Sequence, residues 1–179
     1  MSSLKPGVNP RDHQLGNAHA SITLVEFGDY ECPHCGIAHP LIQRLLKEFD
    51  GKINFVFRNF PLQEVHPHAY ISALAAEAAG KQGKFWKMHD LIFENQLRLN
   101  NNFLFELAED IQLDTERFAK DWKSKDGEEK VEHDFESGVR SGVNGTPGFF
   151  INGNQLVGYN ETYESLLRPI ESKLRIAGV

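Results

Sequence analysis

The sequence contains no run of apolar residues that approaches the roughly 18 needed for a helix to cross a membrane. Cysteine is scarce, with two in 179 residues, which argues against a secreted scaffold built on several disulfides. Basic residues are outnumbered as well, because 19 Lys and Arg against 25 Asp and Glu give a net charge of −6. This balance argues against a general attraction to nucleic acid or to an anionic membrane surface. We therefore expect no membrane span and no nucleic-acid partner.

The first residues, Met-Ser-Ser-Leu-Lys-Pro-Gly, do not include the apolar segment of a secretory signal peptide. The sequence as written therefore predicts a cytoplasmic protein. A periplasmic or other extracytoplasmic protein whose leader has been removed is the alternative. What the sequence does contain is 40% apolar and 25% charged residues, the balance of a globular protein that buries a core.

The apolar pattern predicts a strand, a helix and a second strand in the first third of the chain. Residues 22–27 form a short run, rich in β-branched residues, of the kind found in a strand buried on both faces. Pro33 suits the first turn of the helix that follows, in which Ile37, Leu41 and Leu45 recur every four residues. Residues 52–57 give the second strand, and this order is that of a βαβ unit.

The rest of the chain divides into a helical part and a second strand-bearing part. Residues 148–151 and 155–157 are predicted strands joined by the Asn152-Gly153 turn, and a final helix follows. Between the two strand-bearing parts, helices are predicted over 69–79, 85–96, 103–111, 114–123 and 126–139.

These patterns suggest an organisation in three parts. Residues 1–20 are expected to be an irregular lead-in. Residues 21–60 and 141–179 are expected to form one α/β domain, and residues 61–140 an all-helical insertion within it.

Both cysteines belong to one motif, Cys32-Pro33-His34-Cys35, between the first predicted strand and its helix. Two intervening residues let the sulfurs form one disulfide, and the free N–H groups at a helix N-terminus favour a thiolate there. We expect Cys32 to be the nucleophile and Cys35 to resolve the intermediate. A protonated or hydrogen-bonding His34 would stabilise the same thiolate. Such a pair is inclined to donate its disulfide.

The same motif is also half of a possible zinc site, which needs two further ligands. Histidines are available, but only His66 and His68 have a spacing close to that of a second ligand pair. The sequence therefore favours redox chemistry and no bound metal, with a zinc-binding module as the alternative.

The run Val25–Gly36 resembles the active site of the bacterial DsbA-like branch of the thioredoxin superfamily, in which Pro-His separates the two cysteines. Gly142–Gly153 resembles the loop that holds a cis-proline in that family. The resemblance runs from about residue 20 to the end of the chain. It implies an α/β thioredoxin fold, a central mixed sheet flanked by helices, interrupted by the helical insertion. It also implies a thiol–disulfide oxidoreductase with no cofactor beyond its redox-active disulfide.

The resemblance adds further candidate site residues. Pro33 and His34 correspond to the family's dipeptide, and Thr146 and Pro147 to the cis-proline loop against which a substrate polypeptide docks. Glu26 lies in the middle of the first strand, and burial there would raise its pKa and suit it to exchange a proton with the buried thiol. The family carries an acid at that place. The alternative for Glu26 is a solvent-facing position on a half-exposed strand.

The function expected from these features is disulfide exchange with protein substrates, most simply as a dithiol oxidase. A cytoplasmic reductase or isomerase on the same fold is the alternative, because the cytoplasm keeps thiols reduced. The expected partners are polypeptides with thiols or disulfides and a redox-recycling protein that the sequence does not identify.

Overall fold

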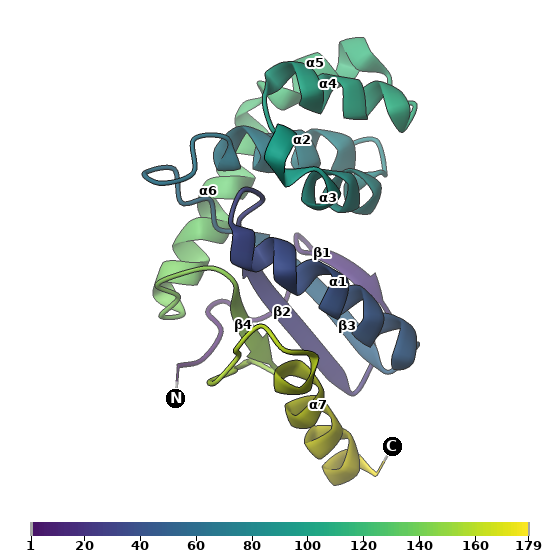
Figure 1. Cartoon of the computed structure of the whole chain (residues 1–179), viewed down its shortest axis with the longest axis vertical. Coiled ribbons are helices and arrows are strands. Elements are labelled where there is room, and N and C mark those ends of the chain that lie inside the picture. The colour runs from purple at the N-terminus through teal and green to yellow at the C-terminus, as the bar shows by residue number, and fades with distance from the viewer. Residues whose placement is uncertain (1, 179) are drawn as a thin grey trace.

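The chain is described by a computed structural model that covers residues 2–178 (Figure 1). Its centre is one mixed five-stranded sheet in the order β1-β3-β2-β4-β5. β2 pairs in parallel with β3 and antiparallel with β4, so β2 is the central strand. The strands are β1 (His13–Gly16), β2 (Ile22–Gly28), β3 (Ile53–Asn59), β4 (Gly148–Ile151) and β5 (Asn154–Gln155).

Within residues 2–178, seven α-helices and one 3₁₀ helix accompany the sheet. The helices α2 to α5 form a layer beyond one end of the sheet, and α6 leads back from that layer toward β4 (Figure 1). Among the helices of residues 2–178, none combines the length and the apolar character that a bilayer crossing requires. The helical elements are α1 (Pro33–Glu48), α2 (Ala69–Gly80), α3 (Phe85–Glu94), η1 (Gln96–Arg98), α4 (Asn101–Asp110), α5 (Thr115–Trp122), α6 (Lys125–Arg140) and α7 (Tyr163–Ala177).

The predicted strand–helix–strand unit is confirmed as β2, α1 and β3. The α/β class is likewise confirmed, and the central mixed sheet is flanked by helices as expected; five α-helices and η1 lie between β3 and β4. Two local expectations are wrong. The return strand is Asn154–Gln155 and not 155–157. Ile37 is 44% exposed on α1, although Leu45 of the same apolar pattern is buried as expected, together with Ile42.

The irregular lead-in predicted for residues 1–20 is also wrong in part, because it contains β1. This strand pairs antiparallel with β3, with His13 opposite Phe57. The preceding Asp12 accepts a hydrogen bond from the buried Arg58 of β3 at 2.8 Å, which fixes the segment against the sheet. A short polar strand of this kind is set by pairing with a distant strand, which local apolar patterning does not reveal.

Alternation along β2 distributes its side chains between two apolar clusters, one on each face of the sheet. Leu24 packs in the larger cluster, which includes helices α1 to α3, and Val25 and Phe27 pack in the smaller one with Phe60 and Phe150. Because successive side chains of a strand point to opposite faces, Glu26 lies on the same face as Leu24. The central strand therefore places one carboxyl group under α1, whose first turn holds the cysteines.

Candidate active site

The two cysteines lie at the N-terminus of α1, after the short loop that follows β2. Cys32 is the N-cap residue of α1, and Pro33 is in the first turn, where a missing N–H leaves no partner unsatisfied. Both thiols are free in the structure, and both residues are buried. The predicted placement at a helix N-terminus is therefore confirmed for Cys32, with Cys35 one turn deeper.

Opposite shifts in pKa separate the two thiols. The pKa of Cys32 falls from 9.0 to about 5, first because the Cys35 thiol hydrogen-bonds to its sulfur, and further through Thr146 and the backbone N–H groups of Cys35 and His34. Burial acts in the other direction on Cys32. For Cys35, burial raises the pKa well above 9.0, and Glu26 adds to the rise. Near neutral pH the pair therefore consists of one thiolate and one thiol.

The loop before β4 brings Thr146 and Pro147 to the cysteines across 114 residues of sequence. The Cys32 sulfur lies 3.4 Å from the Thr146 carbonyl oxygen, which accepts a hydrogen bond from it only when Cys32 is protonated. The Thr146–Pro147 peptide bond is cis. Thr146 thus lies at the sulfur that the sequence analysis predicts to be the nucleophile, and Pro147 follows it through the cis bond.

His34 is placed differently from the expectation that its ring stabilises the Cys32 thiolate. The imidazole is 59% exposed, and its Nδ1 lies 2.6 Å from Oε1 of Glu161, in the segment between β5 and α7. Its backbone N–H, and not its ring, contributes to the low pKa of Cys32. Glu161 adopts φ +64, a left-handed conformation uncommon for a residue with a side chain.

Glu26 is buried, with 2% of its surface exposed, so the solvent-facing alternative is wrong. Burial first, and the Cys32 thiolate second, raise its pKa from 4.5 to about 8. Its Oε1 has no hydrogen-bond partner among the described residues. A carboxyl group that is protonated at neutral pH and electrostatically coupled to both sulfurs can donate or accept one proton there.

Replacing Glu26 with Gln is expected to slow disulfide exchange by about tenfold or more, toward the range typical of a lost general acid–base group. The amide cannot transfer a proton, so the inflection that Glu26 contributes to the pH–rate profile near pH 8 should disappear. Exchange rates with a dithiol peptide between pH 6 and 9.5 measure both effects.

Glu171→Gln, at an exposed position of α7, is the matched control and should leave the profile unchanged. A Glu26→Gln protein with the parent rate and the parent inflection would contradict the proton-transfer role. Thermal unfolding of both variants separates a loss of proton transfer from a loss of fold.

Sequence patterns alone do not single out Asp29, which braces the active-site loop. Its Oδ1 accepts hydrogen bonds from the backbone N–H groups of Glu31 at 2.8 Å and Cys32 at 3.1 Å. Its Oδ2 accepts one from the Leu62 N–H at 2.8 Å and lies 2.8 Å from Nδ1 of His66. An Asp that directly follows a buried strand and precedes the N-cap by three residues is the available signal, because Asp side chains bond backbone groups two or three residues ahead.

Gln96 in η1 is a second contact that the sequence does not indicate. Its side-chain amide donates to the carbonyl oxygens of Tyr30 at 2.8 Å and Cys32 at 2.9 Å. The approach requires glycine at position 36, because a Cβ there would lie 2.0 Å from the Gln96 Oε1. The helical insertion therefore holds the backbone of the redox motif directly.

Among residues 2–178, no group of three or more potential metal ligands includes either cysteine. His66 bonds Asp29, and His68 bonds Glu31, so neither faces the sulfurs as a ligand pair. In residues 2–178, the cluster with metal-ligand spacing is His39, His89 and Asp90, with candidate ligand atoms within 4.8 Å of one another. Neither cysteine belongs to it.

A family model described as Thioredoxin matches residues 8–172. Oxidised BdbD from Bacillus subtilis is a similar solved structure, with a TM-score of 0.84, 25% identity, and coverage of 97% of this chain and 98% of that one. A thioredoxin-like oxidoreductase from Silicibacter pomeroyi DSS-3 has a TM-score of 0.79, 27% identity and 94% coverage of each chain. The α-DsbA2 of Wolbachia pipientis shares the fold at 22% identity, with a TM-score of 0.81 and coverage of 92% and 88%.

Relatives in sequence are much longer proteins. The Na(+)/H(+) antiporter NhaA 1 of Salinispora arenicola is 44% identical over 145 residues, which cover 81% of this chain and 22% of that protein. The Na(+)/H(+) antiporter NhaA of Herminiimonas arsenicoxydans is 40% identical over 156 residues, 87% of this chain and 25% of that protein. The chain therefore spans about a quarter of the length of these relatives.

Proposed function

We propose that this chain, which belongs to the thioredoxin family, is a DsbA-like thiol–disulfide oxidoreductase that donates the Cys32–Cys35 disulfide to protein substrates as a dithiol oxidase. The observation that carries the proposal is the low pKa of Cys32, about 5, beside a buried Cys35 of raised pKa. A stable thiolate stabilises the reduced pair and therefore makes its disulfide a stronger oxidant.

The proposed reaction begins when a substrate thiolate attacks the sulfur of Cys32 in the oxidised pair. The Cys32–Cys35 bond breaks, and the electron pair leaves on Cys35, which takes up a proton. Glu26, protonated below its pKa of about 8, would supply that proton. Because the pKa of Cys35 is raised, this protonation assists the departure of a poor leaving group.

A second thiolate of the same substrate then attacks the substrate sulfur that is bonded to Cys32 in the mixed disulfide. Cys32 is released as a thiolate. The low pKa of Cys32 makes it a good leaving group, which favours this step. Two electrons have then passed from two substrate thiols to the pair, and the substrate holds one disulfide. A separate disulfide-bearing redox protein would reoxidise Cys32 and Cys35, so the pair itself is the only redox group required.

The substrate polypeptide would dock at Thr146 and Pro147, whose backbone is next to the reacting sulfur. The support is the 3.4 Å contact between the Cys32 sulfur and the Thr146 carbonyl oxygen. A donor of disulfides fits an oxidising, extracytoplasmic compartment better than the reducing cytoplasm.

The reduction potential of the pair tests the direction of the reaction. We expect equilibration in glutathione buffers, followed by alkylation of free thiols, to give a value above the cytosolic glutathione range of roughly −320 to −220 mV. A value inside or below that range would overturn the oxidase proposal and favour a reductase or isomerase with the same site. Protein treated with excess dithiothreitol before alkylation provides the fully reduced standard, with both thiols modified.

A further inference from the structure

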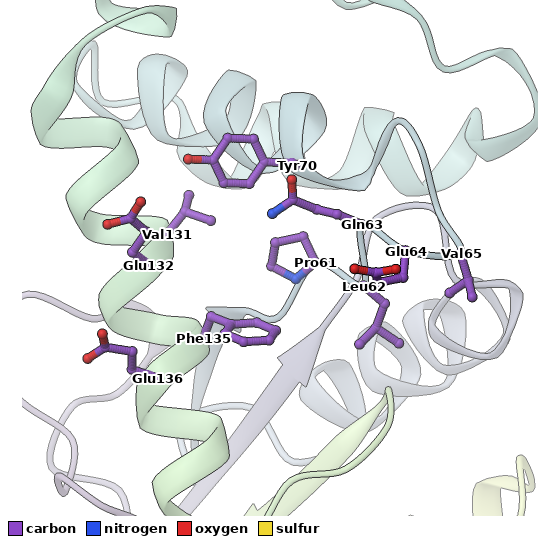
Figure 2. A pocket seen from close by; sticks show the side chains of 10 residues that line it. All are labelled: Pro61, Leu62, Gln63, Glu64, Val65, Tyr70, Val131, Glu132, Phe135 and Glu136. Carbon is purple, nitrogen blue, oxygen red and sulfur yellow. The ribbon is translucent and has the colours of Figure 1, made fainter.

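A pocket of about 610 Å³ lies beside the active-site loop, between the segment that follows β3 and helix α6. Figure 2 shows Glu132 and Glu136 of α6 on one side of its apolar side chains and Glu64 and Val65 on the other. The apolar part of the lining comes from Pro61, Leu62, Val65, Tyr70, Val131 and Phe135.

A buried aromatic ring supports the apolar lining of this pocket. The Phe135 ring stacks on the buried Phe60 ring, with centroids 4.4 Å apart and an interplanar angle of 21°. Helix α6 can approach Phe60 because residue 138 is glycine; a Cβ there would lie 2.5 Å from the ring. At the outer side, Val65 is 67% exposed. Apolar side chains that gather in an exposed hollow with a polar rim are typical of a binding site.

Negative charge surrounds the pocket on α6. Glu128, Glu132 and Glu136 follow one another at intervals of four residues, so they lie along one edge of the helix, where like charges repel. Within residues 2–178, Glu64, Glu128 and Glu132 make no ion pair, while Glu136 pairs with Arg140 at 3.7 Å. Burial is the largest cause that raises the pKa of Tyr70 in the pocket wall, and the charges of Glu128 and Glu132 raise it further. The field of these two carboxylates therefore reaches the pocket wall. A cationic occupant would relieve this repulsion.

The pocket is tied to the redox motif by a single carboxylate. Leu62 in the pocket wall donates its backbone N–H to Asp29 Oδ2 at 2.8 Å, and the other oxygen of Asp29 accepts the backbone N–H of Cys32. A polypeptide lying along residues 61–65 is therefore next to the loop that precedes the reacting sulfur.

We propose that this pocket docks the substrate polypeptide of disulfide exchange, through a bulky apolar side chain flanked by Lys or Arg. The apolar lining would bury the anchor, and the carboxylates of Glu64 and Glu132 would face the flanking cations. The proposal rests on the proposed function and adds the class of substrate that the protein prefers.

The test is the rate at which the oxidised protein oxidises three dithiol peptides of equal length at low ionic strength. Beside the cysteines the first carries Phe between two Lys, the second Phe between two Glu, and the third Ala between two Lys. We expect the first peptide to react roughly fivefold faster than each of the other two. An effect of this size corresponds to the binding free energy that one apolar contact or a few exposed charge pairs contribute. Added salt should reduce the advantage over the Glu peptide.

Two variants and two controls connect that preference to the pocket. Val65→Ser and Glu132→Gln change exposed pocket residues, and each should lower the rate with the first peptide by about threefold while leaving the rate with dithiothreitol unchanged. Ile176→Ser on α7 and Glu129→Gln, which lines a different hollow, should keep the parent rates. Comparing variants on one peptide removes differences in the intrinsic reactivity of its thiols.

The outcomes separate this proposal from the proposed function. If all three peptides are oxidised equally and the pocket variants match the parent, docking is wrong and the function stands. If neither dithiothreitol nor any peptide is oxidised, the proposed function itself fails. A dimer in sedimentation experiments that Val65→Ser dissociates would assign the pocket to a second copy of the chain and overturn the proposal.

Discussion

Replacing Cys32 with Ser is expected to abolish disulfide exchange with any thiol substrate. Cys32 is the sulfur at the N-terminus of α1 whose pKa is about 5, and it is the sulfur beside the Thr146 carbonyl, where a substrate would dock. Cys35 cannot replace it, because Cys35 is fully buried and its pKa is raised well above 9.0. Oxidation of a dithiol peptide, followed by acid quenching and chromatography, measures the loss.

Cys35→Ser should behave differently, because it removes only the resolving step. Its Cys32 thiolate can still attack a substrate disulfide, form a mixed disulfide and release one substrate thiolate. With no second thiol, that adduct should accumulate in a one-to-one ratio, which mass spectrometry of the intact protein detects. Adducts on Cys32→Ser but not on Cys35→Ser would reverse the assignment, and unfolding curves of both variants exclude a loss of fold as the cause.

The features that the sequence predicted correctly depend on residues that lie close together in the chain. An apolar run covering residues 22–27 requires burial on both faces, and β2 is indeed the central strand. Pro33 and the apolar spacing after it fix where α1 begins, which places Cys32 at its N-terminus. Burial was the favoured of two interpretations for Glu26, because a residue in the middle of a strand covered on both faces has no exposed side, and the structure confirms it.

The features that the sequence did not reveal depend on contacts between distant segments. His34 pairs with Glu161, 127 residues away, so the position of its ring follows from the conformation of the segment before α7 and not from the motif. β1 exists because His13 to Gly16 pair with β3 and Asp12 pairs with Arg58. No short-range pattern of apolar residues carries either fact, because both are polar contacts set by the tertiary fold.

The reduced protein is expected to gain stability over the oxidised protein as the pH rises from 5 to 9. Cys32 titrates near pH 5 in the folded reduced state but near 9.0 when unperturbed, so the folded state binds fewer protons in this window. Stability from a lowered pKa is fully present above the unfolded value and is lost as the pH falls through the folded value. The oxidised protein has no thiol at Cys32 and lacks this contribution. Urea unfolding of both forms at several pH values measures the difference.

The same titration fixes how the reduction potential changes with pH. Between pH 5 and 9, reduction takes up one proton per two electrons, because Cys32 remains a thiolate, and the potential should fall by about 30 mV per pH unit. Below pH 5 both sulfurs bind protons, and the slope should double to about 59 mV per unit. Glu26, whose pKa of about 8 is raised in part by the Cys32 thiolate, adds curvature near pH 8 that a Glu26→Gln background removes. A slope of 59 mV per unit that persists from pH 5.5 to 8 in that background would show that Cys32 is a neutral thiol there, and the argument for a disulfide donor would lose its basis.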